Sequence, residues 1–325
     1  MRALKLQRWF RTAGLLVVLA ALVTACSAGV QAQAVRLGII QIVEHPSLDQ
    51  ARQGFLDRLE ELGYTVQADY QNAQGDMATA QIIARSLAES RPDLILAIAT
   101  PTAQAMAQAT STIPILITAV TDPEAAGLVE RNERPGTNVT GTSDLNPVDL
   151  QLALVPKLVP DARRVGIVYN AGEANSVVQV EWARRVAAEL GLTLVEATVA
   201  TSSEVLQAAQ SLVGRVDALY VPTDNTVVSA LEAVVQVAEA ARLPLVVGEP
   251  DSVARGGLIT VGIDYYQLGR QTADIADRVL KGANPAELPI EYQTNPRLVV
   301  NPQAAARMGV QLPEELLVEA EQVGS

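Results

Sequence analysis

The sequence contains one cysteine, one histidine and few aromatic residues, and each shortage excludes a class of protein. One cysteine cannot form an intrachain disulfide, and together with one histidine it cannot supply a multi-Cys/His zinc site. Aromatic residues make up only 3% of the chain, so its cores must be built from Val, Leu, Ile and Ala. Basic residues number 24 against 36 acidic ones, and this imbalance argues against nucleic acid as a partner.

What the sequence does contain is enough apolar material for an ordinary folded protein. Of the 325 residues, 49% are hydrophobic and 18% charged, which excludes a disordered chain. The length predicts about two domains.

The first 25 residues have the pattern of a secretory signal. They hold four basic residues and no acidic one, followed by an apolar run from Ala13 to Val23 that is too short for a typical membrane-spanning helix. The run ends in Val-Thr-Ala-Cys, which resembles the bacterial lipobox, so we expect Cys26 to be lipidated and residues 1–25 to be removed. The alternative is an ordinary signal peptidase site beside an incidental cysteine. With the lipid, the chain would be extracytoplasmic and anchored to the cell membrane.

From Val35 onward, short apolar runs alternate with amphipathic stretches. The runs predict strands at 35–42, 64–70, 94–99, 113–119, 138–142, 164–169, 192–199, 218–221, 245–248 and 258–262. Helical spacing of apolar residues covers 48–62, 177–190 and 227–241. Continuous apolar strands that alternate with helices are typical of parallel sheets covered on both faces. We therefore expect an α/β protein with two doubly wound parallel-sheet lobes.

The break between the lobes is expected near residues 143–147, where Ser-Asp-Leu-Asn-Pro precedes a new helix. A further helix at 266–280 is expected to return to the first lobe, and a strand at 298–300 and a helix near 313–320 to finish the second. Lobe I then comprises 35–143 plus about 265–288, and lobe II comprises 144–264 plus about 289–325. Three crossings would form a multi-segment hinge beside a cleft.

Polar residues follow the predicted strands at the edge where open α/β sheets bind ligands. In lobe I these are Gln41 and its neighbours, Thr100-Pro101-Thr102, and Ala119-Val120-Thr121-Asp122-Pro123. Thr100 and Asp122 are predicted N-caps of two helices, whose free backbone N–H groups suit a ligand carboxylate.

Acidic and tyrosine residues dominate the strand ends of lobe II. They include Tyr169-Asn170, Asp224, Glu249 and, at the crossing, Asp264. Carboxylates there would pair with an ammonium, and a tyrosine face would stack on a side chain, so the cleft suits an α-amino acid. Each acid could instead be a plain helix cap, and His45 is interpreted as a polar loop residue near the cleft.

Several of these segments resemble one bacterial family. They are Gln41–Pro46, Thr118–Pro123, Tyr169–Ser176, Pro222–Asn225 and Gly262–Tyr266. The chain resembles the tryptophan/tyrosine-type substrate-binding proteins of ABC transporters, which are similar to type I periplasmic binding proteins. The likeness implies that Thr100, Thr102, Ala119 and Thr121 hold the ligand's carboxylate and ammonium, and that Tyr169, Asn170, Asp224, Glu249 and Asp264 form the facing wall.

The leading hypothesis is a lipid-anchored, monomeric binding protein that delivers a small α-amino acid, aromatic ones included, to an ABC permease. No cofactor motif, metal site or nucleophile–base pair is apparent, so no enzyme activity is expected. The alternatives are a ligand-sensing subunit of an extracytoplasmic receptor, a protein that binds another small carboxylate, and a hydrolase that uses acids such as Glu44 and Asp122.

Overall fold

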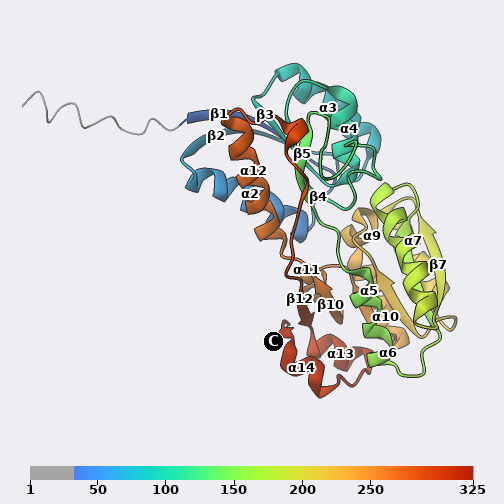
Figure 1. The fold of residues 1–325 in the computed structure, drawn as a ribbon. Coiled ribbons are helices and arrows are strands. Elements are labelled where there is room, and N and C mark those ends of the chain that lie inside the picture. Colours follow the sequence, from blue (N-terminus) through green and yellow to red (C-terminus); the bar gives the residue numbers. More distant parts are fainter. Residues whose placement is uncertain (1–32, 325) are drawn as a thin grey trace, which may run out of the picture.

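Two parallel-dominated sheets, joined by three chain crossings, form the architecture (Figure 1). The computed structural model describes residues 33–324, so the expected signal segment and Cys26 lie outside the described residues. Within that range, no helix has both the length and the apolar character needed to span a membrane. The predicted α/β class with two parallel lobes is confirmed.

Lobe I is built on a six-stranded sheet with the order β11-β5-β4-β3-β1-β2, in which every neighbouring pair is parallel. Its first part comprises β1 (Gln33–Gln41), α2 (Pro46–Glu61), β2 (Tyr64–Asn72), α3 (Met77–Ser90), β3 (Leu94–Ile98), α4 (Thr100–Ala109), β4 (Ile115–Val120) and β5 (Val139–Ser143). The chain later returns to it with α12 (Tyr265–Leu280), η2 (Pro285–Glu287) and β11 (Glu291–Tyr292).

Lobe II is built on a seven-stranded sheet with the order β13-β12-β10-β9-β8-β6-β7. Its main part comprises α5 (Val148–Leu152), α6 (Leu154–Leu158), β6 (Arg164–Asn170), α7 (Ala174–Glu189), β7 (Thr193–Val199), η1 (Ser202–Glu204), α8 (Val205–Leu212), β8 (Ala218–Val221), α9 (Asn225–Ser229), α10 (Leu231–Ala241), β9 (Leu245–Val247), α11 (Pro250–Ala254) and β10 (Ile259–Gly262). The C-terminal part adds β12 (Arg297–Val300), α13 (Pro302–Met308), α14 (Glu314–Glu319) and β13 (Glu321–Gln322).

The structure differs from the sequence-based expectation in three places. Strand β12 runs antiparallel to β10, because the chain arrives from lobe I at the opposite end of the sheet. Strand β11 pairs with β5, so lobe I extends to residue 292, beyond the expected boundary near 288. The helix expected over 227–241 is divided at Ala230 into α9 and α10.

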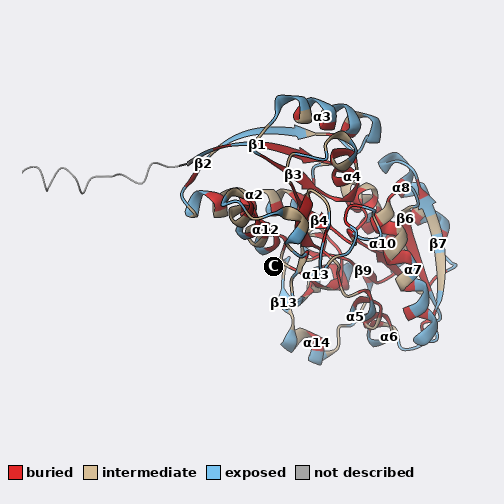
Figure 2. Cartoon of the chain, turned by 45° about the horizontal axis from the view of Figure 1, so that its top comes forward, coloured by how far each residue is buried: buried red, intermediate tan, exposed pale blue. Residues whose placement is uncertain are grey.

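Each lobe has its own apolar core. One cluster of buried residues runs from Val35 to Val139 and resumes at Ile263, and the other runs from Val148 to Leu316. In Figure 2 the central strands are buried, whereas the outer strands β2 and β7 carry many exposed residues. Among the described residues the two clusters stay separate, so neither core fills the space between the lobes.

Two glycines bring α2 and α12 into backbone contact in lobe I. A Cβ on Gly54 would lie 2.0 Å from the carbonyl oxygen of Tyr266, and one on Gly269 would lie 1.9 Å from that of Ala51. Only glycine fits such a close helix–helix approach. This packing fixes α12, which lies against β4 and β5, and with it Tyr265 at the start of the helix.

Candidate functional site

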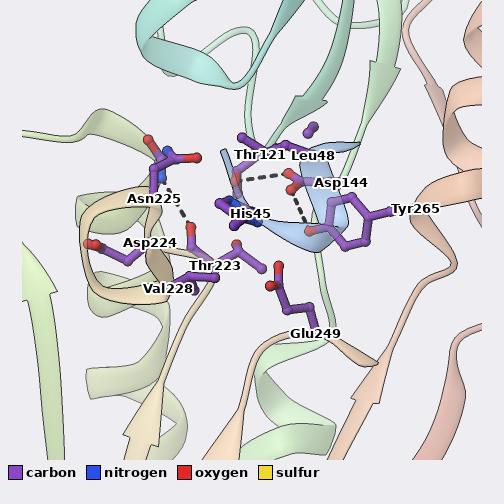
Figure 3. A pocket seen from close by; sticks show the side chains of 12 residues that line it. His45, Leu48, Thr121, Asp144, Thr223, Asp224, Asn225, Val228, Glu249 and Tyr265 are labelled. Atoms are coloured by element: carbon purple, nitrogen blue, oxygen red, sulfur yellow. Dashed lines mark hydrogen bonds between the residues drawn. The ribbon is translucent and has the colours of Figure 1, made fainter. Parts of the chain in front are cut away.

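A small cavity lies between the lobes, at the ends of their strands (Figure 3). Lobe I contributes His45, Leu48, Ala119, Thr121 and Tyr265 to its wall. Lobe II contributes Asn175, Thr223, Asp224, Asn225, Val228 and Glu249, and the first crossing contributes Asp144. About 10 Å³ of the cavity is open to the centre of a water molecule, which is room for about one water, so a larger ligand requires the wall to move.

Asp144 is a buried carboxylate on the crossing between β5 and α5. Its two oxygens accept hydrogen bonds from the Thr121 hydroxyl (3.0 Å) and the Tyr265 hydroxyl (2.7 Å). Burial raises the pKa of Asp144 above its usual range, and the two hydroxyls oppose that rise. The two neutral donors orient the carboxylate without neutralising its charge.

Glu249 is a second buried carboxylate, placed by the turn between β9 and α11. One oxygen accepts a hydrogen bond from the Ser252 hydroxyl (3.0 Å). Burial, together with the charges of Asp251 and Asp144, raises the pKa of Glu249 to about 7. No lysine or arginine is among the described residues that line the cavity, so both carboxylates lack a cation there.

Asp224 also lines the cavity, but its oxygens are already used within lobe II. They accept hydrogen bonds from the backbone N–H groups of Asn170 (2.6 Å) and Val227 (2.7 Å) and from the Ser176 hydroxyl (2.6 Å). Burial and the charge of nearby Glu173 raise the pKa of Asp224 to about 7. Asp224 therefore caps α9 and holds the strand-end loops in place.

Glu173 organises the lobe II wall beside Asp224. Its carboxylate accepts hydrogen bonds from the Asn225 side chain, from the hydroxyl of Thr226 (2.7 Å) and from the Asn175 amide (3.2 Å). Glu173 thus positions two cavity-lining amides, Asn175 and Asn225, at the start of α7 and α9.

His45 faces this wall from lobe I, at the turn after β1. Burial and the positive charge of Arg255 lower the pKa of the imidazole to about 3, although a hydrogen bond with Asn225 acts in the opposite direction. The imidazole is therefore neutral at physiological pH.

Two polar atoms in the cavity wall have no hydrogen-bond partner. They are Nδ1 of His45, a residue 6% exposed, and Oδ1 of Asn175, a residue 4% exposed. A buried polar atom left unpaired costs about 1–3 kcal/mol, so such atoms at a cavity indicate a ligand that satisfies them.

The turns that end β3 and β4 are strained. Ala99 and Ala119 adopt φ values of 78° and 55°, a region that normally favours glycine. Ala99 N donates to the carbonyl oxygen of Thr118 (3.1 Å), so α4 begins beside Ala119 in the cavity wall. The strain lies where lobe I presents backbone to the cavity.

These turns also differ from the predicted caps. Ala99, not Thr100, is the N-cap of α4, and Pro101 occupies the second helical position. Asp122 accepts hydrogen bonds from the N–H groups of Glu124 (3.1 Å) and Ala125 (3.0 Å), but the residues after it form turns and no helix. Of the two helix N-termini expected after β3 and β4, only that of α4 is therefore present.

A direct hydrogen bond joins the lobes beside the cavity. The Ser47 hydroxyl, at the start of α2, donates to Asp251 in α11 (2.9 Å). The crossing residue Asn146 also joins the parts, because its amide donates to the Tyr265 hydroxyl (3.4 Å) and its Oδ1 accepts from the Ile263 N–H (3.2 Å).

Four of the ten predicted ligand-binding residues line the cavity, and they come from both lobes: Ala119, Thr121, Asp224 and Glu249. Asn170 lies in an adjoining interlobe groove, where its amide donates to Thr226 (2.9 Å). Thr100 is buried at the start of α4, and its hydroxyl has no partner.

The other four predicted residues are placed elsewhere by local hydrogen bonds. Gln41 bonds Asp49 (2.9 Å) within lobe I, and the Thr102 hydroxyl bonds the carbonyl of Ile98 (2.6 Å). The Tyr169 hydroxyl donates to Glu196 on β7 (2.7 Å).

Asp264 is the fourth, and it belongs to the second crossing. Its carboxylate caps α12 by accepting from the Gln267 N–H (3.0 Å) and pairs with Arg297 (3.1 Å). The charge of Asp264 is thus matched by a basic residue outside the cavity.

Sequence reasoning did not single out Asp144, His45 or Asn175 as ligand contacts. Asp144 lies in the Ser-Asp-Leu-Asn-Pro segment that marked the lobe break. An acid in a crossing segment was the available signal, because crossings border the cleft.

In the part of the chain that the structure describes, no cluster of three or more His, Cys, Asp or Glu is arranged to hold a metal ion. The chemistry that the cavity offers is capture of a cation, such as an ammonium, by Asp144 and Glu249.

Comparison with known sequences identifies the relatives. The sequence model of the ABC transporter substrate binding protein family matches residues 36–324. A tyrosine-binding protein of Clostridioides difficile is 45% identical over 269 residues, which cover 82% of this chain and 78% of that protein.

Two solved structures are similar along nearly their full length. One is an ABC domain from Streptococcus pneumonia in complex with L-Trp, 37% identical, with a TM-score of 0.87 and coverage of 90% of this chain and 100% of the other. The second is a ligand-free, open substrate-binding protein from Clostridium difficile, 42% identical, with a TM-score of 0.68 and coverage of 90% and 99%. The open protein is closer in sequence but less similar in structure, so the lobes of this chain are arranged as in the ligand complex.

Proteins of this family bind a substrate outside the cytoplasm for a transporter and are not enzymes. A family match over residues 36–324, a relative 45% identical and a two-lobed fold around a closed cavity lead to one conclusion. The chain belongs to the ABC transporter substrate-binding protein family.

Proposed function

We propose that this protein binds an α-amino acid with an aromatic side chain in the interlobe cavity and delivers it to an ABC importer. The observation that carries the proposal is the pair of buried carboxylates, Asp144 and Glu249, in a wall whose described residues include no lysine or arginine. A buried charge without a partner is costly, and a ligand ammonium supplies the missing cation.

The ligand carboxylate is assigned to lobe I. Helix α4 begins beside Ala119, and its N-cap residue, Ala99, makes no side-chain capping bond. The N–H groups of a first helical turn have no partner within the helix and lie at the positive end of its dipole. These N–H groups suit an anion, whereas the rest of the wall, which is acidic, does not.

The ligand side chain is assigned to the apolar part of the wall. Leu48, Val228 and the ring of Tyr265 line the cavity between the polar groups. Support for an aromatic side chain comes from the relatives, one named a tyrosine-binding protein and one solved with L-Trp.

Delivery depends on closure around the ligand. The two lobes have separate cores, and the cavity wall is complete only when both are present. A ligand that contacts both lobes stabilises the closed arrangement over the open one, and this difference is what a permease can sense.

Isothermal titration calorimetry on protein freed of bound ligand by unfolding and refolding tests the proposal. L-Tyr and L-Trp should bind, while 3-indolepropionate, which lacks the ammonium, should bind at least 100-fold more weakly, as expected for loss of a buried charge pair costing about 3–5 kcal/mol. Asp144→Asn should weaken the amino acids and spare the deamino compound. Equal binding of L-Trp and 3-indolepropionate would contradict the ammonium site.

Membrane anchoring through Cys26 is part of the same proposal, carried by the lipobox-like sequence. Cys26→Ser should release the protein from membranes and leave ligand affinity unchanged, measured by cell fractionation and calorimetry. Continued membrane retention of the variant would refute the lipid anchor.

A further inference from the structure

The side chain of Asn146 joins two of the chain crossings next to the proposed ammonium site. Asn146 is buried on the first crossing, two residues after the cavity carboxylate Asp144. Its Oδ1 accepts a hydrogen bond from the N–H of Ile263 on the second crossing (3.2 Å). Its NH₂ group donates to the backbone carbonyl of Asp144 (3.0 Å) and to the hydroxyl of Tyr265 (3.4 Å). Two of these three partners belong to residues that line the cavity.

The backbone partners of Asn146 determine which way its amide points. A backbone N–H can only donate and a backbone carbonyl can only accept. The Ile263 N–H therefore requires the amide oxygen on its side, and the Asp144 carbonyl requires the NH₂ group on the other. As a result, the amide presents an N–H group, and not its oxygen, to the Tyr265 hydroxyl.

The orientation of this amide decides where the Tyr265 hydroxyl sends its proton. The hydroxyl has one proton to donate, and the NH₂ group of Asn146 cannot accept it. The proton is therefore left for Oδ2 of Asp144, 2.7 Å from the hydroxyl oxygen (Figure 3). A hydrogen bond to an ionised acceptor is about twice as strong as a neutral one. The result is a directed chain of hydrogen bonds that starts at the second crossing and ends on the cavity carboxylate.

The direction of the Asp144 carboxylate matters for capture of an ammonium. Thr121 holds one of its oxygens (3.0 Å) and Tyr265 holds the other, so both fix its rotation while leaving lone pairs for a ligand. A carboxylate that is already oriented loses less conformational freedom when a ligand binds. Loss of the Tyr265 bond would leave one oxygen without its donor and the carboxylate free to turn.

A second side-chain amide meets the same crossing without reaching the site. Gln293, on the third crossing, accepts from the N–H of Asp264 (3.1 Å) and donates to the carbonyl of Asp264 (2.6 Å). Neither Asp144 nor Tyr265 is among its hydrogen-bond partners in the described part of the chain, and Gln293 does not line the cavity. Gln293 therefore distinguishes a role in joining the crossings from a role in placing the carboxylate.

We infer that Asn146 is a positioning residue of the ammonium site, which directs the Tyr265 hydroxyl to Asp144 and so orients the carboxylate for the ligand. This inference rests on the proposed function. Asn146 itself does not line the cavity, so it acts through Tyr265 and Asp144. It contributes to the preference for an amino acid over a compound that lacks the ammonium.

The test measures the dissociation constant of 3-indolepropionate divided by that of L-Trp, by calorimetry on ligand-stripped protein. This ratio isolates the contribution of the ammonium. Asn146→Ala should lower the ratio about 3- to 10-fold, because it weakens binding of L-Trp and spares 3-indolepropionate. Gln293→Ala is the matched control and should leave the ratio unchanged. Tyr265→Phe should lower the ratio about 10-fold, and adding Asn146→Ala to it should lower the ratio further by less than about twofold.

Equal weakening of both ligands by Asn146→Ala would overturn the inference, because it would show a role in the hinge and none at the carboxylate. An equal fall of the ratio in Gln293→Ala would overturn it as well. Full additivity with Tyr265→Phe would overturn the route through the hydroxyl. If Asn146→Ala fails to fold, Asn146→Ser, which keeps a polar side chain but lacks the NH₂ group, decides the question. If L-Trp binds the wild-type protein no better than 3-indolepropionate, the proposed function itself fails.

Discussion

Replacing Glu249 by glutamine should make the ligand-free protein more stable and the ligand complex weaker. The pKa of Glu249 is about 7, against an ordinary value of 4.5. The folded protein therefore keeps this proton up to about pH 7, whereas the unfolded chain loses it near pH 4.5. The contribution of Glu249 to stability is greatest below pH 4.5 and is lost as the pH rises to about 7 and above.

The magnitude follows from that difference. At about 1.4 kcal/mol per pKa unit, ionised Glu249 lowers the free energy of unfolding by about 3 kcal/mol at pH 8. Glutamine is neutral at every pH and can still accept the hydrogen bond from Ser252. Glu249→Gln should therefore stabilise the ligand-free protein by about 3 kcal/mol at pH 8 and change little at pH 4.

Urea unfolding of the two ligand-free proteins from pH 4 to pH 8 measures this effect. Comparing them at each pH removes the opposite contribution of His45, whose lowered pKa of about 3 destabilises the folded protein between pH 6.5 and 3. Glu89→Gln, at an exposed position on α3, is the control and should give no pH-dependent difference. In the Glu249→Gln protein, affinity for the amino acid should fall at least 30-fold at pH 8. A ligand-free Glu249→Gln protein that is less stable than the wild type at pH 8 would refute the reasoning.

Two further predictions concern closure and backbone strain. Ser47→Ala removes the interlobe hydrogen bond to Asp251 and should weaken ligand affinity about 5- to 30-fold in calorimetry. Ser211→Ala is the control and should leave the affinity unchanged, because the Ser211 hydroxyl bonds only within its own helix. Equal affinities of the wild type and Ser47→Ala would show that this bond does not favour closure. Ala99→Gly relieves a φ of 78° and should raise the free energy of unfolding by about 1 kcal/mol, while Ala105→Gly inside α4 should lower it by about as much. A destabilised Ala99→Gly protein, measured by urea unfolding, would mean that the turn after β3 is not strained.

The fold was largely predictable because its signals are local. Apolar runs such as Leu94–Ile98 and the helical spacing over Pro46–Glu61 report burial directly, and both appear in the structure within about two residues of the expected bounds. The antiparallel strand β12 and the short strand β11 were not predictable in this way, because their pairing depends on where a distant crossing returns the chain.

The candidate site was predictable only as a region. Thr121 and Glu249, singled out by their strand-end position, line the cavity, because parallel strands bring their carboxyl ends to one edge. Side-chain direction decided the rest: the Tyr169 hydroxyl points to Glu196 on the neighbouring strand, and Asp264 pairs with Arg297 at the start of β12. Asp144 lines the cavity because the crossing that holds it is buried between the lobes, and hydrophobic periodicity in the sequence does not indicate such burial.

A crystal structure of the protein with bound L-Tyr or L-Trp tests most directly whether the buried carboxylates hold the ligand's ammonium. The ammonium nitrogen is expected within about 3 Å of a carboxylate oxygen of Asp144 or Glu249, with the ligand carboxylate at the start of α4. An ammonium placed elsewhere, with Asp144 and Glu249 facing the ligand's side chain or bonded only to water, would contradict it.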